Sequence, residues 1–160
     1  MRPETTRRTL LHLAPALLAM PAVAVAQSDA PALRVFRAPG CGCCEGWTEH
    51  LRRAGFTVTL EDAPDLDAVR RAAAVPDDLV GCHTGLLGDG LVVEGHVPAV
   101  ALRRFLAEPA GWRGLAVPGM PLGSPGMEVS GAQPEAYTVF AFAADGRRAA
   151  FMAARGDGAA

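Results

Sequence analysis

The chain has 160 residues, of which half are hydrophobic, and a formal net charge of −2 at pH 7. It contains no lysine, and this argues against a nucleic-acid-binding protein, because such proteins neutralise phosphates with clustered Lys and Arg. The length suits one domain with a modest hydrophobic core.

The N-terminal residues have the pattern of an export signal. Three arginines precede an apolar stretch (residues 10–25) that runs into the sequence Ala-Val-Ala ending at Ala26, as in a secretory signal peptide. The paired arginines also approximate a twin-arginine signal, so both export routes stay open. A membrane anchor fits less well, because the stretch is short for a bilayer and contains two prolines. We expect residues 1–26 to be a cleaved signal peptide and residues 27–160 to form a periplasmic domain without a membrane segment.

The first part of this domain switches between strand and helix patterns. Residues 33–38 and 56–61 largely alternate apolar and polar side chains, which predicts two strands. Residues 44–54 carry apolar side chains three and four positions apart and stop at a glycine, which predicts a helix. The same spacing over residues 66–73, ahead of Pro76, predicts a second helix.

A hairpin and a third helix are expected next. The apolar residues 79–87 and 91–96 flank a Gly-Asp-Gly turn, which is a hairpin signature. Pro98 can occupy the first position of a helix that continues through Glu108. The residues of this helix expected to pack inward are Val100, Phe105 and Leu106.

The C-terminal part begins with an unusual segment, residues 109–126, in which half of the residues are Pro or Gly. This composition predicts no regular structure, but the apolar residues within it indicate an ordered, functional loop. Residues 137–142 and 148–152 should form two strands around an Asp-Gly turn, and residues 155–160 a disordered tail.

The order strand, helix, strand, helix, hairpin, helix resembles the thioredoxin fold, with a Cys-x-x-Cys where the first strand meets the first helix. We therefore expect an α/β (α+β) protein. Its thioredoxin-like core should cover about residues 33–108 of the single domain, and a Pro/Gly/Met-rich loop and β extension about residues 109–152. Pro76 lies near the position of the cis-proline of that fold, although a simple helix stop explains it equally well.

Three of the four cysteines stand together as Cys41, Cys43 and Cys44, and the fourth is Cys82. Export would favour disulfides, but adjacent cysteines bridge only with strain, so Cys41 and Cys44 are the one comfortable local pair. A helix start favours the thiolate form. Three sulfurs and a nearby fourth suit a metal better than a two-electron dithiol switch.

The choice of metal follows from ligand softness. Thiolates select Cu(I) or Zn(II), and structural zinc usually takes two separated ligand pairs, which this spacing does not offer. Cu(I) accepts low coordination numbers and bridging thiolates, so packed cysteines can hold several copper ions in one cluster.

Other soft or borderline ligands are secondary candidates. The loop contributes Met120 and Met127, whose alternative role is core packing. His96 ends the hairpin and can bind metal, cap a helix or form a hydrogen bond. His83 adjoins Cys82, and in an extended strand the two point to opposite faces, so we expect only Cys82 to reach the site. His50 is interpreted as a packed or surface histidine.

Four motifs occur in order and make the chain similar to a known family. They are Pro-Gly-Cys-Gly-Cys-Cys-Glu-Gly-Trp, Gly-Cys-His-Thr, Glu-Gly-His-Val-Pro-Ala and Gly-Leu-Ala-Val-Pro-Gly-Met-Pro-Leu-Gly-Ser-Pro-Gly-Met-Glu. Together they resemble the exported copper-resistance proteins called CopG, over residues 33–142. The resemblance implies a thioredoxin-like core with a C-terminal extension. It also implies a copper site built from Cys41, Cys43, Cys44 and Cys82.

The function predicted from these observations is a periplasmic Cu(I)-binding protein of copper resistance, more a metal-binding protein than an enzyme. Its partners would be copper ions and other periplasmic copper-handling proteins. Two alternatives stay open: a thiol–disulfide oxidoreductase that uses Cys41 and Cys44, and a copper carrier that loads an oxidase.

Overall fold

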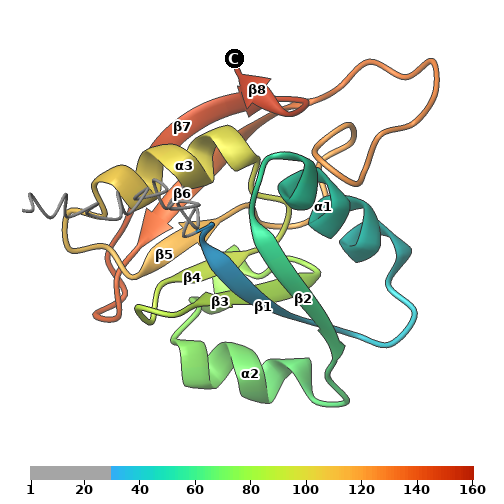
Figure 1. The fold of residues 1–160 in the computed structure, drawn as a ribbon. Coiled ribbons are helices and arrows are strands. Elements are labelled where there is room, and N and C mark those ends of the chain that lie inside the picture. Colours follow the sequence, from blue (N-terminus) through green and yellow to red (C-terminus); the bar gives the residue numbers. More distant parts are fainter. Residues whose placement is uncertain (1–29) are drawn as a thin grey trace, which may run out of the picture.

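The structure is a computed structural model that describes residues 30–160, so the predicted signal peptide lies outside the described residues. Within residues 30–160, three helices and one continuous sheet make up the mixed α/β fold (Figure 1), which confirms the predicted class. The strands are β1 (Ala32–Arg37), β2 (Thr57–Asp62), β3 (His83–Leu87), β4 (Val92–Glu94), β5 (Gly114–Ala116), β6 (Ala136–Phe142), β7 (Arg148–Arg155) and β8 (Gly158–Ala159). The helices are α1 (Gly42–Arg53), α2 (Leu66–Ala73) and α3 (Ala99–Ala107).

The sheet has eight strands in the order β2-β1-β3-β4-β5-β6-β7-β8. The pairs β1–β2 and β4–β5 are parallel, and the other pairs are antiparallel. Each parallel pair is joined by a connection that contains a helix, as parallel strands require. The predicted core region and the C-terminal extension therefore share one sheet.

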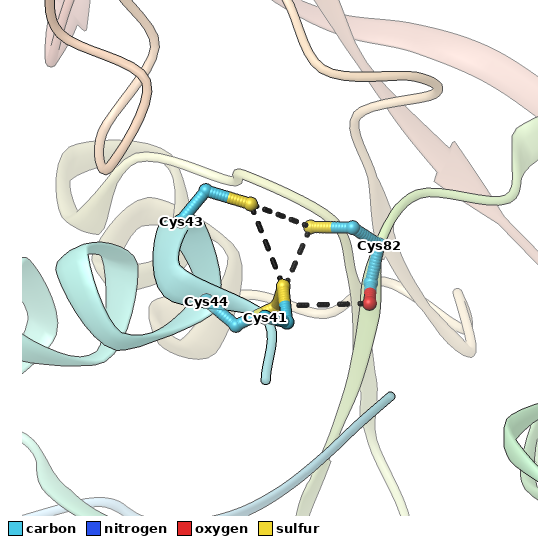
Figure 2. A group of neighbouring side chains, drawn as sticks. All are labelled: Cys41, Cys43, Cys44 and Cys82. Carbon is cyan, nitrogen blue, oxygen red and sulfur yellow. Dashed lines mark hydrogen bonds between the residues drawn. A yellow bond between two sulfur atoms is a disulfide. The ribbon is translucent and has the colours of Figure 1, made fainter. Parts of the chain in front are cut away.

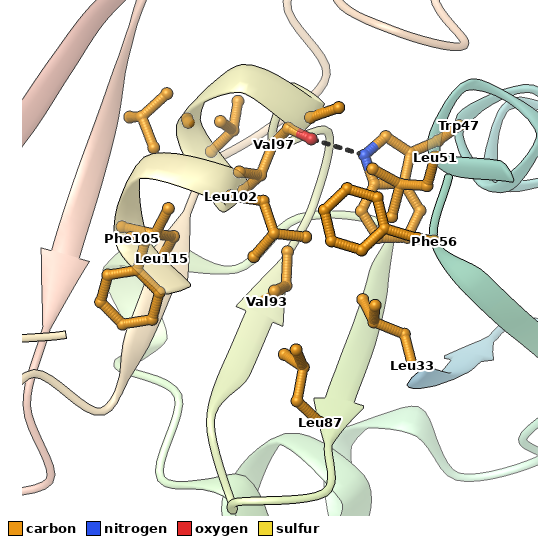
Figure 3. Close-up of a cluster of buried hydrophobic side chains, with 14 of the residues drawn as sticks. Leu33, Trp47, Leu51, Phe56, Leu87, Val93, Val97, Leu102, Phe105 and Leu115 are labelled. Carbon is orange, nitrogen blue, oxygen red and sulfur yellow. Dashed lines mark hydrogen bonds between the residues drawn. The ribbon is translucent and has the colours of Figure 1, made fainter. Parts of the chain in front are cut away.

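Hydrophobic side chains cover both faces of the sheet. On one face, Trp47 and Leu51 of α1 and Phe105 of α3 pack against the strands (Figure 3). On the other face, α2 covers a smaller cluster. Val93 belongs to the first cluster and its neighbour Val92 to the second, because successive side chains of a strand point to opposite faces.

The first helix ends as its sequence predicts. Gly55 follows its last turn with φ +86°, a conformation that costs glycine little because it has no Cβ. In α3 the predicted inward face is partly wrong. Phe105 is fully buried, but Val100 is 44% exposed, and Ala101 and Leu102 take the inward positions. Pro98 is the residue before α3 rather than its first residue.

The predicted hairpin forms, but its first strand is shorter than expected. Leu79 ends a short 3-10 helix (Asp77–Leu79), and β3 begins only at His83. Pro76 directly precedes that 3-10 helix, and among the described residues no peptide bond is cis. Helix α2 has already ended at Ala73, so Pro76 lies in the connection between that helix and the 3-10 helix.

Two predictions for the C-terminal part are wrong. The Pro/Gly-rich segment contains a strand, β5, which pairs with β4 and β6. Gly114 permits this close approach, because a Cβ there would lie 2.2 Å from the Val92 carbonyl oxygen. The tail is ordered rather than disordered: β7 extends to Arg155 and pairs with β8, and the Tyr137 hydroxyl donates to the Gly156 carbonyl oxygen at 2.5 Å.

Within residues 30–160, no helix has the length and apolar character that crossing a membrane would need.

Candidate metal centre

The four cysteine sulfurs meet where α1 begins (Figure 2). Cys41 is the residue before α1, and Cys43 and Cys44 lie in its first turn. Cys82, directly before β3, brings the fourth sulfur. Its Sγ lies 3.7 Å from the Sγ of Cys43 and 3.6 Å from that of Cys44, and the Sγ atoms of Cys41 and Cys43 are 3.5 Å apart. The structure therefore brings together the four cysteines that the sequence analysis selected.

Two of these cysteines are joined. Cys41 and Cys44 form a disulfide, with their Cα atoms 5.5 Å apart, in the range of ordinary disulfides. This is the local pair expected from the spacing. Cys43 and Cys82 are free thiols. In this covalent state the chain offers two thiols, and four thiolates become available only after two electrons reduce the disulfide.

A buried ion pair holds the backbone beside Cys82. The carboxylate of Glu94 is fully buried and accepts hydrogen bonds from the Gly81 N–H at 2.9 Å and the Thr84 hydroxyl at 2.6 Å. Arg70 donates both to Glu94, at 3.0 Å, and to the Gly81 carbonyl oxygen, at 2.6 Å. Burial raises the pKa of Glu94. Both polar groups of Gly81 are thus satisfied by one buried network that fixes the entry to Cys82.

Two histidines also lie against Cys82. The Cys82 Sγ lies 3.2 Å from Nδ1 of His83 and 2.9 Å from Nε2 of His96. As expected, Cys82 and not His83 belongs to the four-sulfur group, but the two side chains contact each other. Cys82 lies in a bend before β3, so the alternation of an extended strand does not separate the two side chains.

The orientation of the His96 ring is set by the Pro/Gly-rich loop. Its Nδ1 lies 2.7 Å from the Pro125 carbonyl oxygen. A carbonyl oxygen can only accept, so Nδ1 carries the proton. Burial lowers the pKa of His96, which favours the neutral ring. The free lone pair is therefore on Nε2, directed at the Cys82 sulfur.

His83 is deeply buried between two rings. Its ring centroid lies 4.2 Å from that of Trp47 and 5.0 Å from that of His96. Burial lowers its pKa strongly, and its Nε2 has no hydrogen-bond partner among the described residues. Trp47 is itself held by a hydrogen bond of 2.8 Å from its indole N–H to the Val97 carbonyl oxygen (Figure 3).

The electrostatics around Cys82 favour its neutral thiol. Burial raises the pKa of Cys82 above its ordinary value, and the neighbouring Cys43 raises it further. A metal that binds this sulfur must displace the proton, so metal binding at Cys82 releases a proton.

The loop lies directly on α1. Gly126 has φ +86°, and a Cβ there would lie 2.5 Å from the Cys43 carbonyl oxygen. Met127 follows it and is half-buried, whereas Met120 is 54% exposed. The ligand roles of these two methionines stay predictions. The loop contacts the cysteine helix and also holds His96.

Sequence reasoning missed Arg70, Glu94 and Pro125, which position the site without supplying a ligand. A carboxylate inside the apolar run 91–97 was the available signal for Glu94, because a charged residue in a buried strand needs a partner. His50 lies outside the site: its Nε2 accepts a hydrogen bond of 3.1 Å from the Ala99 N–H at the start of α3. This confirms the interpretation of His50 as a packed histidine.

Comparison with known proteins gives the following similarities. Residues 79–127 match a family model described as "Protein of unknown function, DUF411". Two solved structures, "Copper resistance protein copG- Form 1" and "Form 2", are 40% and 41% identical in sequence, with TM-scores of 0.72 and 0.74. The first match covers 81% of this chain and 100% of the solved chain, and the second covers 79% and 99%. No curated protein sequence matches the chain.

Proposed function

Because this chain belongs to the CopG family of copper-resistance proteins, we propose that it binds copper in the periplasm as part of copper resistance and homeostasis. Cu(I) would be held by the thiolates of Cys41, Cys43, Cys44 and Cys82. The observation that carries this proposal is the convergence of four sulfur atoms that all lie within 4.8 Å of one another.

The sulfur spacing fits metal coordination. Thiolate–metal bonds at a tetrahedral ion are about 2.3 Å long, which places two sulfurs on one ion about 3.8 Å apart. The Cys43–Cys82 and Cys44–Cys82 separations are 3.7 Å and 3.6 Å. After small movements, Cys82 can therefore share an ion with Cys43 and, once the disulfide is reduced, with Cys44. Such sharing is the basis for proposing a polynuclear cluster with bridging thiolates.

The predicted export signal supports the same role. The signal-like residues 1–26 would deliver the domain to the periplasm, an oxidising compartment where a Cys41–Cys44 disulfide can persist. Copper loading through four thiolates then requires a reduced domain, so we expect copper binding to depend on the redox state of this pair.

The test is an anaerobic Cu(I) titration of the reduced domain, residues 27–160, with bound copper and free thiols both counted. The expected result is several copper ions per chain with all four thiols protected. Cys43→Ser should sharply lower the stoichiometry, while Glu49→Gln, on the same helix, should not change it. An unchanged stoichiometry in Cys43→Ser would contradict the thiolate cluster.

The disulfide itself favours a second candidate function, thiol–disulfide exchange. Cys41 is partly exposed before α1 and Cys44 is buried one turn on. In the reduced protein, the Cys41 thiolate would attack a substrate disulfide. Cys44 would then attack the Cys41 sulfur of the mixed disulfide and release the substrate as a dithiol. Insulin reduction by dithiothreitol, catalysed by Cys43→Ser protein but not by Cys41→Ser, would support this function over copper binding.

A further inference from the structure

Cys82 belongs to two donor sets at once. One set is the four sulfurs, and the other is Cys82 with His83 and His96, whose ligand atoms also lie within 4.8 Å of one another. With the Cys41–Cys44 disulfide closed, the sulfur set keeps only the thiols of Cys43 and Cys82. The set of Cys82, His83 and His96 keeps all three of its ligand atoms.

The geometry of the second set suits a single ion. A sulfur bond of about 2.3 Å and nitrogen bonds of about 2.0 Å to one ion place the ligand atoms about 3.5 Å apart. The Cys82 Sγ lies 3.2 Å from His83 Nδ1 and 2.9 Å from His96 Nε2. If each nitrogen moved away from the sulfur by less than about 1 Å, a metal ion could take the place of the thiol proton between them.

The ring of His96 is already oriented as a metal ligand. Histidines that bind metals commonly donate their second ring N–H to a backbone carbonyl or a carboxylate, which fixes the tautomer and the ring direction. The contact of His96 Nδ1 with the Pro125 carbonyl oxygen does this at 2.7 Å. The nitrogen left free, Nε2, is the one that faces Cys82.

The second histidine is held against Cys82 through its other nitrogen. His83 is completely buried, and its Nδ1 lies 3.2 Å from the Cys82 Sγ. Its Nε2, which has no hydrogen-bond partner among the described residues, is not the nitrogen that would bind the ion. Trp47 and His96 pack on the His83 ring, which keeps Nδ1 beside the cysteine.

We propose that Cys82, His83 and His96 form a mononuclear copper site that is available while Cys41 and Cys44 are joined. One thiolate and two imidazoles form a donor set that holds copper in electron-transfer sites, so it accommodates both Cu(I) and Cu(II). The thiolate cluster, in contrast, favours Cu(I). This inference rests on the proposed copper binding but assigns a different set of ligands and a different covalent state.

The test uses the Cys43→Ser variant with its disulfide intact, in which Cys82 is the remaining thiol. Cu(II) is added anaerobically, and a parallel sample receives Co(II), which does not oxidise thiols. We expect one metal ion per chain and an intense thiolate-to-metal charge-transfer absorption. No such band with either ion, or binding that leaves the Cys82 thiol free to react, would overturn the proposal.

Three further variants in this background identify the ligands. His96→Asn keeps a side-chain N–H for the Pro125 carbonyl oxygen but removes the ligand nitrogen, and His83→Gln removes Nδ1. Each should abolish the charge-transfer band and weaken metal binding at least about tenfold. That is the smallest loss typical of removing a residue that only hydrogen-bonds to a metal ligand, and a ligand itself should matter more. His50→Gln, a histidine outside the site, should leave the band unchanged. A band insensitive to both His83 and His96 contradicts the assignment, and circular dichroism verifies that each variant is folded.

The reduced wild-type domain separates the two proposals. If it binds Cu(I) through its thiols while the disulfide form shows no histidine-dependent site, only this inference fails. If the reduced domain also binds no copper, the proposed function fails with it.

Discussion

The two sides of Cys82 differ in how they are built. On one side, Cys41, Cys43 and Cys44 come from four consecutive residues at the start of α1, where Cys41 and Cys43 are partly exposed. On the other side, His83 and His96 are completely buried and come from β3 and the segment after β4. We call these the sulfur side and the nitrogen side.

The difference indicates how each side responds to its surroundings. The sulfur side contains a disulfide, so its number of available donors changes with redox state. The nitrogen side is fixed by packing against Trp47 and by the Pro125 carbonyl oxygen, and no covalent change alters it. One sulfur, that of Cys82, links a variable donor set to a constant one.

The largest expected effect comes from removing the shared atom. Cys82→Ser should reduce copper binding in both the reduced and the disulfide forms, by more than the roughly 10–100-fold typical of losing an outer partner. Cys43→Ser is the matched control, since it should affect only the reduced form. Equilibrium dialysis with metal analysis measures both. If either form of Cys82→Ser bound copper normally, Cys82 would not be a ligand that the sulfur side and the nitrogen side share.

The next variant removes the support that holds Cys82 between the sides. Arg70→Met leaves the Glu94 carboxylate buried without its cation, and breaking a buried ion pair in this way costs about 3–5 kcal/mol of unfolding free energy. Arg71→Met, whose contact with Asp65 is exposed and 3.8 Å long, should cost at most about 1 kcal/mol. Urea denaturation of both variants provides the comparison, and equal losses would show that the buried network does not stabilise this region.

A smaller loss is expected where the loop rests on the sulfur side. Gly126→Ala places a Cβ 2.5 Å from the Cys43 carbonyl oxygen and 2.6 Å from the backbone nitrogen of Trp47. The left-handed backbone alone costs about 1–2 kcal/mol for alanine. Gly119→Ala shares that cost, with φ +69° and no atom within 4 Å of the new Cβ. The excess loss of stability in Gly126→Ala, measured by urea denaturation, reports the contact. Identical stabilities would mean that the loop does not press on α1.

The smallest effect concerns His50, which belongs to neither side. Burial lowers its pKa in the folded state, whereas the unfolded chain has a pKa of about 6.5. Below about pH 6.5 the unfolded state therefore binds more protons than the folded state, and the free energy of unfolding falls as the pH decreases. Protonated Nε2 also cannot accept from the Ala99 N–H. As the pH is lowered from about 7.5 to about 5, the Tm of the wild type should fall more steeply than that of His50→Gln. Parallel curves of Tm against pH for the two proteins would refute this.

Local patterns predicted most of the elements but not how their ends meet the site. Cys44, Trp47 and Leu51 share one buried face of α1, as their spacing indicates. The start of β3 was misplaced, because the 3-10 helix at Leu79 interrupts an apolar run that reads as one strand. That error also hid the contact of His83 with Cys82. Strand β5 was missed because its pairing partners, not its composition, make Gly114–Ala116 extended.

What the sequence determined by itself was the chemistry: soft sulfur donors at a helix start, a Cys-x-x-Cys pair, and four ordered motifs of a copper-resistance family. These are properties of residue type and short spacing, which local geometry carries directly. Only the tertiary structure decided that His83 and His96 face Cys82, that Pro125 orients His96, and that Arg70 and Glu94 hold Gly81. Those contacts join residues up to 29 positions apart, and the packing of the whole sheet, rather than any local pattern, brings them together.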